Sequence, residues 1–281
     1  MTETDKQKER RKSSDEVVNE LIEKSGNGFH TKVARYLREN DWTVRLGQYY
    51  VDAATDKPRE IDLIAERVLL QGRPYRNQVE LHLRLIIECK YVPSDVVFWM
   101  DAMDVVSATA LIESTTPMKS SRSSLSRHHY LQGRTVVAKL FAGRPDGKED
   151  SDPVFRALNQ CMGGYVNTGR LQIIDQKSSS KAVLDLSYPI IVFNCFEKFH
   201  QINMVGSGPN TAEAVKDNFQ FEAHYAYKRE NRAASQYMLV DMVSYDLFDR
   251  FLASLYKEAE EVMLLSELDE HDGIAGYEEV D

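Results

Sequence analysis

The spacing of apolar residues in the N-terminal third of the chain changes from a helical period to a strand period. Between residues 29 and 37, apolar side chains recur at positions i, i+4, i+5 and i+8, which form one face of a helix. Residues 42–52, 59–70 and 79–92 instead alternate apolar with polar positions, and turn-forming residues separate them. The pattern predicts a helix followed by three strands in a meander.

Beyond this meander the pattern predicts a mixture of helices and strands. The spacing in residues 97–113 favours a helix, whereas the Ser/Thr-rich, basic residues near 114–134 favour a loop or flap. Asp152-Pro153 is typical of a helix start. The remaining elements are expected at 134–141 (strand), 153–168 (helix), 188–196 (buried strand), 219–227 and 236–245 (strands) and 246–266 (long amphipathic helix). The expected fold class is α/β.

Composition limits the possible classes of protein. The 281 residues are 42% hydrophobic and 28% charged, which excludes collagen-like, mucin-like and wholly disordered chains. No apolar run approaches the ~18 residues that cross a bilayer, so no membrane association is expected, and the polar first fifteen residues predict no secretory signal. The odd number of widely separated cysteines indicates neither a disulfide framework nor a zinc site, and a cytoplasmic location is expected.

The net charge of −9 is concentrated at one end of the chain. Ten acidic residues and no Lys or Arg occur from Glu258 onward, and without them 34 acidic residues stand against 35 basic ones. The acidic total therefore does not exclude a polyanionic substrate, but any basic surface must be local.

Two acidic residues interrupt strongly apolar strand segments. Asp62 lies within Ile-Asp-Leu-Ile-Ala, and Glu88 within Leu-Ile-Ile-Glu-Cys. A buried carboxylate destabilises a fold unless something compensates it. If the second and third strands pair antiparallel, Asp62 lies beside Glu88 and Lys90, which share one strand face. A divalent cation would compensate the two carboxylates, and oxygen ligands without His or Cys favour Mg²⁺.

Such a site suits the hydrolysis of phosphodiester bonds. A divalent metal polarises the scissile phosphate and helps to generate hydroxide from water. Lys90 is placed to orient the attacking water and to neutralise the charge that develops on phosphorus.

These segments resemble the PD-(D/E)XK, or restriction-endonuclease-like, nucleases. The resemblance rests on Asp62 in REIDLIA, on Glu88-Cys89-Lys90 in LIIECKYV, and on GFHTKVARYLRENDWTV as the preceding helix and first strand. It covers roughly residues 25–92, with 153–168 and 189–196 as later core elements. It implies a mixed central sheet, Mg²⁺ (or Mn²⁺ in its place) held by Asp62, Glu88 and the Cys89 carbonyl, and cleavage of nucleic acid, most often DNA.

Two positions differ from the usual family pattern. Ile61 stands where many members have a proline before the first acid. His30 stands near the place of a glutamate on the first helix; it is a candidate to hold metal-bound water, and a surface histidine is the alternative. Gln160 and Tyr165 are the nearest counterparts of a Gln and a Tyr that some relatives place near the metal.

The predicted flap carries several basic side chains. Lys119, Arg122, Arg127 and His128 are candidates for contacts with phosphates along a nucleic-acid backbone, and a disordered loop is the alternative. His128-His129 would need a third ligand within reach to form a metal site.

We therefore expect a Mg²⁺-dependent DNA nuclease that works as a homo-oligomer or beside a separate partner protein, in defence against foreign DNA or in repair. Three alternatives remain: a nuclease-like module that binds nucleic acid or protein without cutting, an assembly protein led by the C-terminal helix, and an edge strand on which Glu88 and Lys90 merely pair in water. The expected organisation is a basic tail and short helix at 1–24, a nuclease-like core at 25–200, strands and a helix packed on it at 201–266, and an acidic tail at 267–281.

Overall fold

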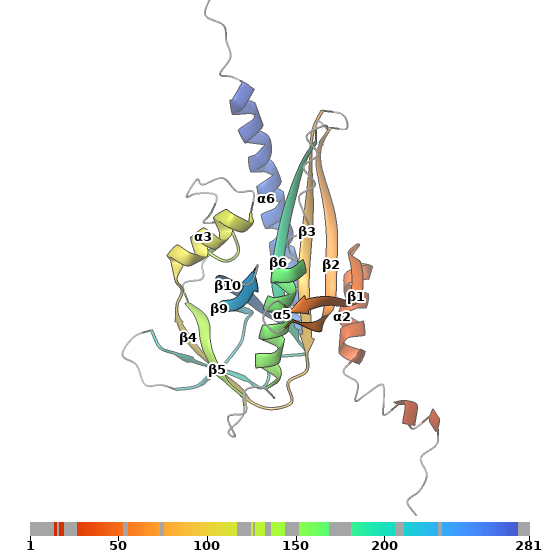
Figure 1. Ribbon diagram of the computed structural model, residues 1–281, viewed down its shortest axis with the longest axis vertical. Helices are drawn as coiled ribbons and strands as arrows, with labels where there is room; N and C mark the ends of the chain where they lie inside the picture. The colour runs from red at the N-terminus through yellow and green to blue at the C-terminus, as the bar shows by residue number, and fades with distance from the viewer. Residues whose placement is uncertain are drawn as a thin grey trace, which may run out of the picture.

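The computed structural model describes residues 14–15, 17–19, 27–52, 56–73, 76–116, 125, 127–132, 136–143, 152–168, 181–205, 211–229 and 232–274. These residues form a mixed α/β fold around a ten-stranded sheet of order β1-β2-β3-β6-β10-β9-β5-β4-β7-β8 (Figure 1). The strands are β1 Thr43–Asp52, β2 Lys57–Arg73, β3 Arg76–Lys90, β4 Val96–Ala102, β5 Val136–Ala142, β6 Lys181–Phe193, β7 Phe199–Asn203, β8 Glu213–Ala214, β9 Phe219–Arg229 and β10 Arg232–Ser244. The helices are α2 Asn27–Glu39, α3 Val105–Thr115, α5 Pro153–Thr168, the 3-10 turn η2 Tyr245–Leu247 and α6 Phe248–Ile274. Among the helices in these ranges, none has the length and apolar content needed to cross a membrane.

The predicted N-terminal helix and three-strand meander are confirmed. Helix α2 buries Val33, Ala34 and Leu37, and it ends where Asp41 adopts a positive φ of 62°. Strand β1 pairs antiparallel with β2, and β2 pairs antiparallel with β3. The antiparallel pairing brings the end of β3 beside the early part of β2.

The last two strands, β9 and β10, lie inside the sheet, whereas β7 and β8 form one end of it. Strand β6 is parallel to both β3 and β10, β10 is antiparallel to β9, and β9 is parallel to β5. The sheet therefore continues across residue 200, and the residues expected to pack on the core complete its central sheet.

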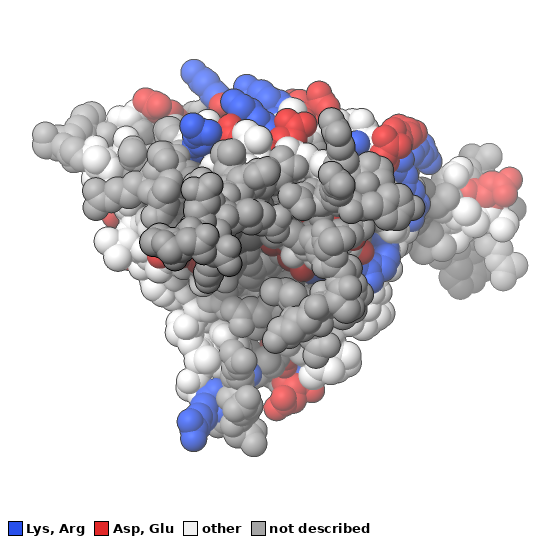
Figure 2. Space-filling view, turned by 90° about the horizontal axis from the view of Figure 1, so that it is seen from above, with Lys and Arg blue, Asp and Glu red and all other residues white. Residues whose placement is uncertain are grey.

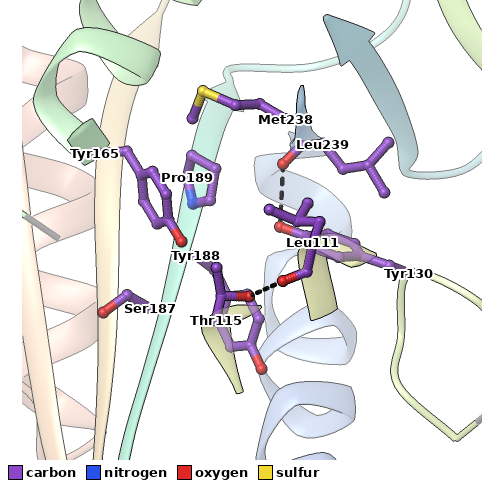
Figure 3. Close-up of a pocket in the computed structure, with 9 residues that line it drawn as sticks. All are labelled: Leu111, Thr115, Tyr130, Tyr165, Ser187, Tyr188, Pro189, Met238 and Leu239. Atoms are coloured by element: carbon purple, nitrogen blue, oxygen red, sulfur yellow. Dashed lines mark hydrogen bonds between the residues drawn. The ribbon is translucent and has the colours of Figure 1, made fainter. Parts of the chain in front are cut away.

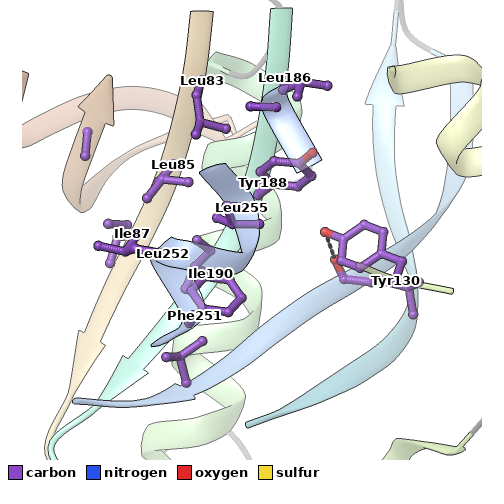
Figure 4. Packing of buried hydrophobic residues seen from close by; sticks show 14 of the residues in the cluster. Leu83, Leu85, Ile87, Tyr130, Leu186, Tyr188, Ile190, Phe251, Leu252 and Leu255 are labelled. Carbon is purple, nitrogen blue, oxygen red and sulfur yellow. Dashed lines mark hydrogen bonds between the residues drawn. The ribbon is translucent and has the colours of Figure 1, made fainter. Parts of the chain in front are cut away.

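The two faces of β3 pack against different helices. Its odd-numbered residues Leu83, Leu85 and Ile87 belong to the same buried cluster as Leu252 and Leu255 of α6 (Figure 4). On the opposite face α5 approaches closely, because a Cβ at Gly164 would lie only 2.9 Å from Ile61 and 3.3 Å from Ile86. Covering both faces explains why this strand has a nearly continuous apolar sequence.

The sheet curves around α5. Asp52, at the end of the outer strand β1, accepts a hydrogen bond of 3.5 Å from the Tyr225 hydroxyl on β9. Helix α5 passes between these strands, and a Cβ at Gly163 would lie 2.8 Å from the Tyr50 hydroxyl and 3.1 Å from the Tyr225 hydroxyl. A side chain at this position would therefore displace the Tyr50 hydroxyl and press on that of Tyr225.

One secondary-structure prediction is wrong in part. The helix expected over 97–113 is strand β4 followed by helix α3, because Val96, Phe98 and Met100 are buried with a period of two. Asp104 separates the two elements, and its side chain caps α3 by accepting a hydrogen bond from Ser107 N–H. The helix start expected at 152–153 is confirmed, since the Asp152 carboxylate accepts hydrogen bonds from the first turn of α5.

Candidate active site

Two carboxylates meet where β2 and β3 separate. The antiparallel register pairs Leu63 with Ile87, so Asp62 and Glu88 are the next positions along the two strands. The backbone N–H of Asp62 donates to Glu88 Oε1 at 3.3 Å, and the backbone N–H of Cys89 donates to Asp62 Oδ2 at 2.8 Å. These reciprocal contacts hold both carboxylates in place across the strand pair.

Lys90 joins the two carboxylates. Its Nζ lies 2.8 Å from Glu88 Oε2 and 3.5 Å from Asp62 Oδ2. The exposed fraction of the side chain is 0% for Glu88, 13% for Asp62 and 19% for Lys90. We call these three residues the carboxylate–lysine trio: the site is buried at Glu88 and open to solvent at Asp62 and Lys90.

His30 reaches the trio from α2. Its Nε2 lies 3.4 Å from Asp62 Oδ2 and 3.3 Å from the Cys89 carbonyl oxygen. The structure therefore brings together the groups predicted from the sequence, although they come from a helix and two strands: Asp62, Glu88, Lys90, the Cys89 carbonyl and His30.

The trio brings three ionisable groups together in a largely buried place. Burial raises the pKa of Glu88 to about 8, with the Asp62 carboxylate adding to the rise and Lys90 opposing it. Burial lowers the pKa of Lys90, but the carboxylates of Glu88 and Asp62 outweigh this effect and raise it overall. Lys90 is thus held as an ammonium ion beside a Glu88 carboxyl that binds a proton more readily than an ordinary glutamate does.

The donor set fits a hard divalent cation. Asp62 and Glu88 offer carboxylate oxygens. The Cys89 carbonyl oxygen lies near Asp62, because His30 Nε2 contacts both of them. Mg²⁺ and Mn²⁺ prefer such oxygen ligands. A cation there would also favour the ionised form of Glu88, whose pKa burial raises.

Gln160 and Tyr165 face different surroundings. Tyr165 packs against the apolar cluster of Tyr50, Ile61, Ile64 and Ile86 next to the trio. Gln160 instead lines a separate hollow, and none of the trio lines that hollow. Residues five apart on a helix point about 140° away from each other, so Gln160 and Tyr165 face different sides of α5, and a role for Gln160 beside the trio stays a prediction.

The candidate phosphate contacts of the flap have different outcomes. Lys119 and Arg122 lie outside the described residues, and Arg127 is exposed. His128 is only 1% exposed, so the expectation that it contacts nucleic acid is wrong: its ring is buried against Glu258, with Nε2 3.1 Å from Glu258 Oε1. On the face shown in Figure 2, basic and acidic side chains lie next to one another along one edge, so charges of both signs are mixed there.

His128 belongs to a buried cluster that sequence analysis missed. We call His128, His129, Asp241 and Glu258 the histidine cluster. His129 Nδ1 lies 2.7 Å from Glu258 Oε2, and its Nε2 lies 3.0 Å from Asp241 Oδ2. The Tyr188 hydroxyl also donates to Glu258. The cluster joins the segment 127–132 to β10, β6 and α6.

The histidine cluster supplies the third ligand that a metal pair would need. The potential ligand atoms of His128, His129 and Glu258 lie within 4.8 Å of one another, a spacing at which one ion can be held. However, Nδ1 of His128 accepts a hydrogen bond from Tyr130 N–H at 3.2 Å. A neutral imidazole then carries its proton on Nε2 and donates it to Glu258, which favours a proton-filled network over a metal site.

The two histidines have opposite pKa shifts. Burial lowers the pKa of His128 to about 3. Burial also acts to lower the pKa of His129, but the carboxylates of Glu258 and Asp241 outweigh it and raise the pKa to about 10. Burial acts to raise the pKa of Glu258, and the adjacent histidines reverse this and lower it to about 2. The cluster therefore holds one imidazolium between two carboxylates.

These shifts predict that stability declines on both sides of about pH 6.5, the pKa of an unperturbed histidine. Above it, the unfolded state loses the proton that folded His129 keeps until about pH 10, so His129 stabilises less as the pH rises. Below it, His128 binds a proton in the unfolded state but stays neutral in the folded state down to about pH 3, so stability falls. Glu258 adds to this loss of stability below pH 4.5, because its carboxylate is protonated more readily in the unfolded state. Urea unfolding from pH 4 to 10 checks this; the alkaline decline should shrink in His129→Gln, and an equal decline in both proteins would contradict it.

A pocket beside this cluster is too small for a substrate. It has a volume of about 10 Å³ and lies between Tyr130, Tyr188 and α3 (Figure 3). Two of its lining hydroxyl groups donate to backbone carbonyls, Thr115 to Leu111 at 2.7 Å and Tyr130 to Leu239 at 3.1 Å. Such a volume suits one water molecule at most.

The missed cluster had a signal in the sequence. Asp241 interrupts the apolar run Met-Leu-Val-Asp-Met-Val, just as Asp62 and Glu88 interrupt theirs. Glu258 falls among the ten acidic residues counted toward a solvated end, yet it is 3% exposed on the same face of α6 as Leu255 and Val262. The helical period, applied across that charge-rich segment, would have identified it.

Comparisons of the chain with protein-family models, with curated proteins and with solved structures found no match.

Proposed function

We propose that this protein is a metal-dependent nuclease that hydrolyses phosphodiester bonds in DNA. The observation that carries the proposal is the convergence of Asp62, Glu88, Lys90 and the Cys89 carbonyl at one end of the β2–β3 pair. The order helix, three-strand meander, helix and parallel strand supports a restriction-endonuclease-like core around this site.

Each residue has a role that follows from its position. Asp62, Glu88 and the Cys89 carbonyl would hold Mg²⁺ or Mn²⁺, which supplies charge for polarising the phosphate and activating water. The Lys90 ammonium, 2.8 Å from Glu88, orients a water at the open side of the site and stabilises negative charge there. His30, in contact with Asp62 and the Cys89 carbonyl, keeps both oxygens oriented or holds a water.

The alternative is a nuclease-like module that binds without cutting. In that case the trio would be a buried ion-pair network with a structural role only. The two possibilities differ in their dependence on metal ions.

Incubation of the purified protein with supercoiled plasmid in Mg²⁺, Mn²⁺ or EDTA tests the proposal. We expect nicking in either metal and none in EDTA, because phosphate polarisation needs the cation. Asp62→Asn should abolish nicking, since it removes one ligand charge. Asp56→Asn is the matched control: Asp56 is exposed in the β1–β2 turn, and asparagine tolerates its positive φ of 55°.

Cleavage that survives EDTA, or that Asp62→Asn retains, would contradict the proposal. Retained DNA binding without cutting in any metal would favour the binding module. A labelled RNA strand in the same assay separates DNA from RNA as the substrate.

A further inference from the structure

A second concave site lies close to the trio. It is a hollow of about 550 Å³ between β1, β2, α5 and β9, and we call it the Arg59–Arg156 hollow. Its size is within the range of about 300–1,000 Å³ that is typical of small-molecule sites. Tyr50, Asp52, Phe155 and Tyr225 also line it.

Two arginines give the mouth of the hollow a positive charge. Arg59 on β2 keeps nearly half of its side chain exposed, and Arg156 on α5 is exposed. Asp52 is the acid among the lining residues, and its Oδ2 lies 3.5 Å from Arg59 Nε, so one positive charge remains in excess. Guanidinium groups bind phosphate through paired hydrogen bonds.

The walls of the hollow are aromatic. Tyr50 and Tyr225 are 8% and 7% exposed, and Phe155 is partly exposed on α5. Tyr225 lies parallel to Tyr227, with ring centroids 6.0 Å apart and an interplanar angle of 17°. Burial, with the Asp52 carboxylate next in effect, raises the pKa of Tyr225 to about 12, so its hydroxyl stays a hydrogen-bond donor. Aromatic rings next to guanidinium groups suit the flat face of a base attached to a phosphate.

The hollow is connected to the trio through one layer of side chains. Tyr50 lines the hollow and also packs with Ile61 and Ile86. Ile61 directly precedes Asp62 in the chain. Arg59 is three residues from Asp62 on β2, which corresponds to about 10 Å along an extended strand. This distance equals the rise of about three nucleotides of a duplex strand.

We propose that the Arg59–Arg156 hollow binds one nucleotide unit, a phosphate with its base, a few nucleotides along the strand from the bond at the trio. The position along the strand rests on the proposed nuclease function, whereas the ligand chemistry follows from the residues of the hollow. The same chemistry would accept a free mononucleotide.

Binding without cleavage tests this inference. A fluorescent single-stranded DNA oligonucleotide is titrated with the full-length protein in EDTA at several salt concentrations, and dAMP is added as a competitor. Arg156→Gln should weaken binding and lower the slope of log K against log[salt] by about 0.7, the value for one phosphate contact on a single strand. Phe155→Leu keeps an apolar side chain but removes the ring, and it should weaken binding about tenfold. Arg250→Gln is the matched control, because Arg250 is an exposed arginine of α6. The thermal unfolding midpoints of Arg250→Gln and Arg156→Gln should both equal that of the wild type.

The outcomes separate the two sources of the ligand. Weaker oligonucleotide binding in Arg156→Gln, with no competition by dAMP in the wild type, assigns the hollow to a nucleotide of the strand. Competition by dAMP that Arg156→Gln abolishes assigns it to a free nucleotide. Wild-type affinity and salt slope in both Arg156→Gln and Phe155→Leu would overturn the inference. If the wild type cuts no plasmid, and Arg156→Gln still weakens oligonucleotide binding, the nuclease proposal fails and the hollow remains a nucleotide site.

Discussion

Replacing Lys90 with methionine is expected to slow metal-dependent cleavage by roughly 10²–10³-fold, the loss typical when one donor that stabilises transition-state charge is removed. Methionine keeps the length and apolar stem of the side chain but lacks the ammonium ion, which lies 2.8 Å from Glu88 and 3.5 Å from Asp62. The fold should tolerate the change, because Glu88, whose pKa burial raises to about 8, can take up a proton when its cation is lost. Single-turnover cleavage of a labelled duplex at saturating Mg²⁺ measures the effect.

Lys139→Met is the matched control for this substitution. Lys139 on β5 also forms an ion pair, with its Nζ 3.0 Å from the Glu222 carboxylate, and neither residue belongs to the trio. It should cleave at the wild-type rate. Equal rates for Lys90→Met and the wild type, with the same thermal midpoint, would show that Lys90 takes no part in the chemistry.

The convergence of the trio could be predicted because two independent patterns agree. The period-two spacing of 59–70 and 79–92 predicted two adjacent strands, and antiparallel pairing then brings Asp62 to Glu88. Both acids also interrupt apolar runs, which marks positions where burial must be compensated. His30 does not interrupt an apolar run, and its contact with Asp62 depends on how α2 packs on the sheet, which the sequence pattern of the helix does not indicate.

The arrangement of the sheet could be predicted only in part. Alternation determines which face of a strand is buried, but it does not say which strand pairs with which. The insertion of β10 and β9 between β6 and β5 therefore has no local signal in the sequence. The hollow depends on the same long-range packing, because the curved sheet brings Tyr225 of β9 within hydrogen-bond distance of Asp52 on β1.

Local sequence patterns identify the two acidic residues of the histidine cluster but not the histidines. Asp241 and Glu258 each occupy a buried position that local patterns indicate, and this predicts that each needs a partner. The partner is His129, which is 112 residues from Asp241 and 129 residues from Glu258 along the chain. Local patterns can therefore identify an acid that requires compensation, but the identity of the compensating group depends on the tertiary fold.

Glu258→Gln is expected to lower the free energy of unfolding by roughly 3–5 kcal/mol, the range for breaking a buried ion pair by removing one partner. Glu258 accepts hydrogen bonds from His129 N–H, His129 Nδ1 and the Tyr188 hydroxyl, and His128 Nε2 lies 3.1 Å away. Glutamine keeps the volume but has one acceptor oxygen in place of two, and its amide group faces donors. The midpoint of urea unfolding at pH 7 should fall with an unchanged slope.

Glu260→Gln on the same helix separates this effect from a change in helix stability. Glu260 is exposed, whereas Glu258 is 3% exposed, and the two substitutions are chemically identical. The control should shift the free energy of unfolding by no more than about 0.5 kcal/mol, as surface substitutions do.

The destabilisation of Glu258→Gln should also decrease toward pH 10, where folded wild-type His129 loses its proton and the ion pair disappears. Equal stability of the two variants at pH 7 would mean that the cluster contributes no net ion-pair energy, and a constant difference between pH 7 and 10 would place the proton elsewhere than on His129.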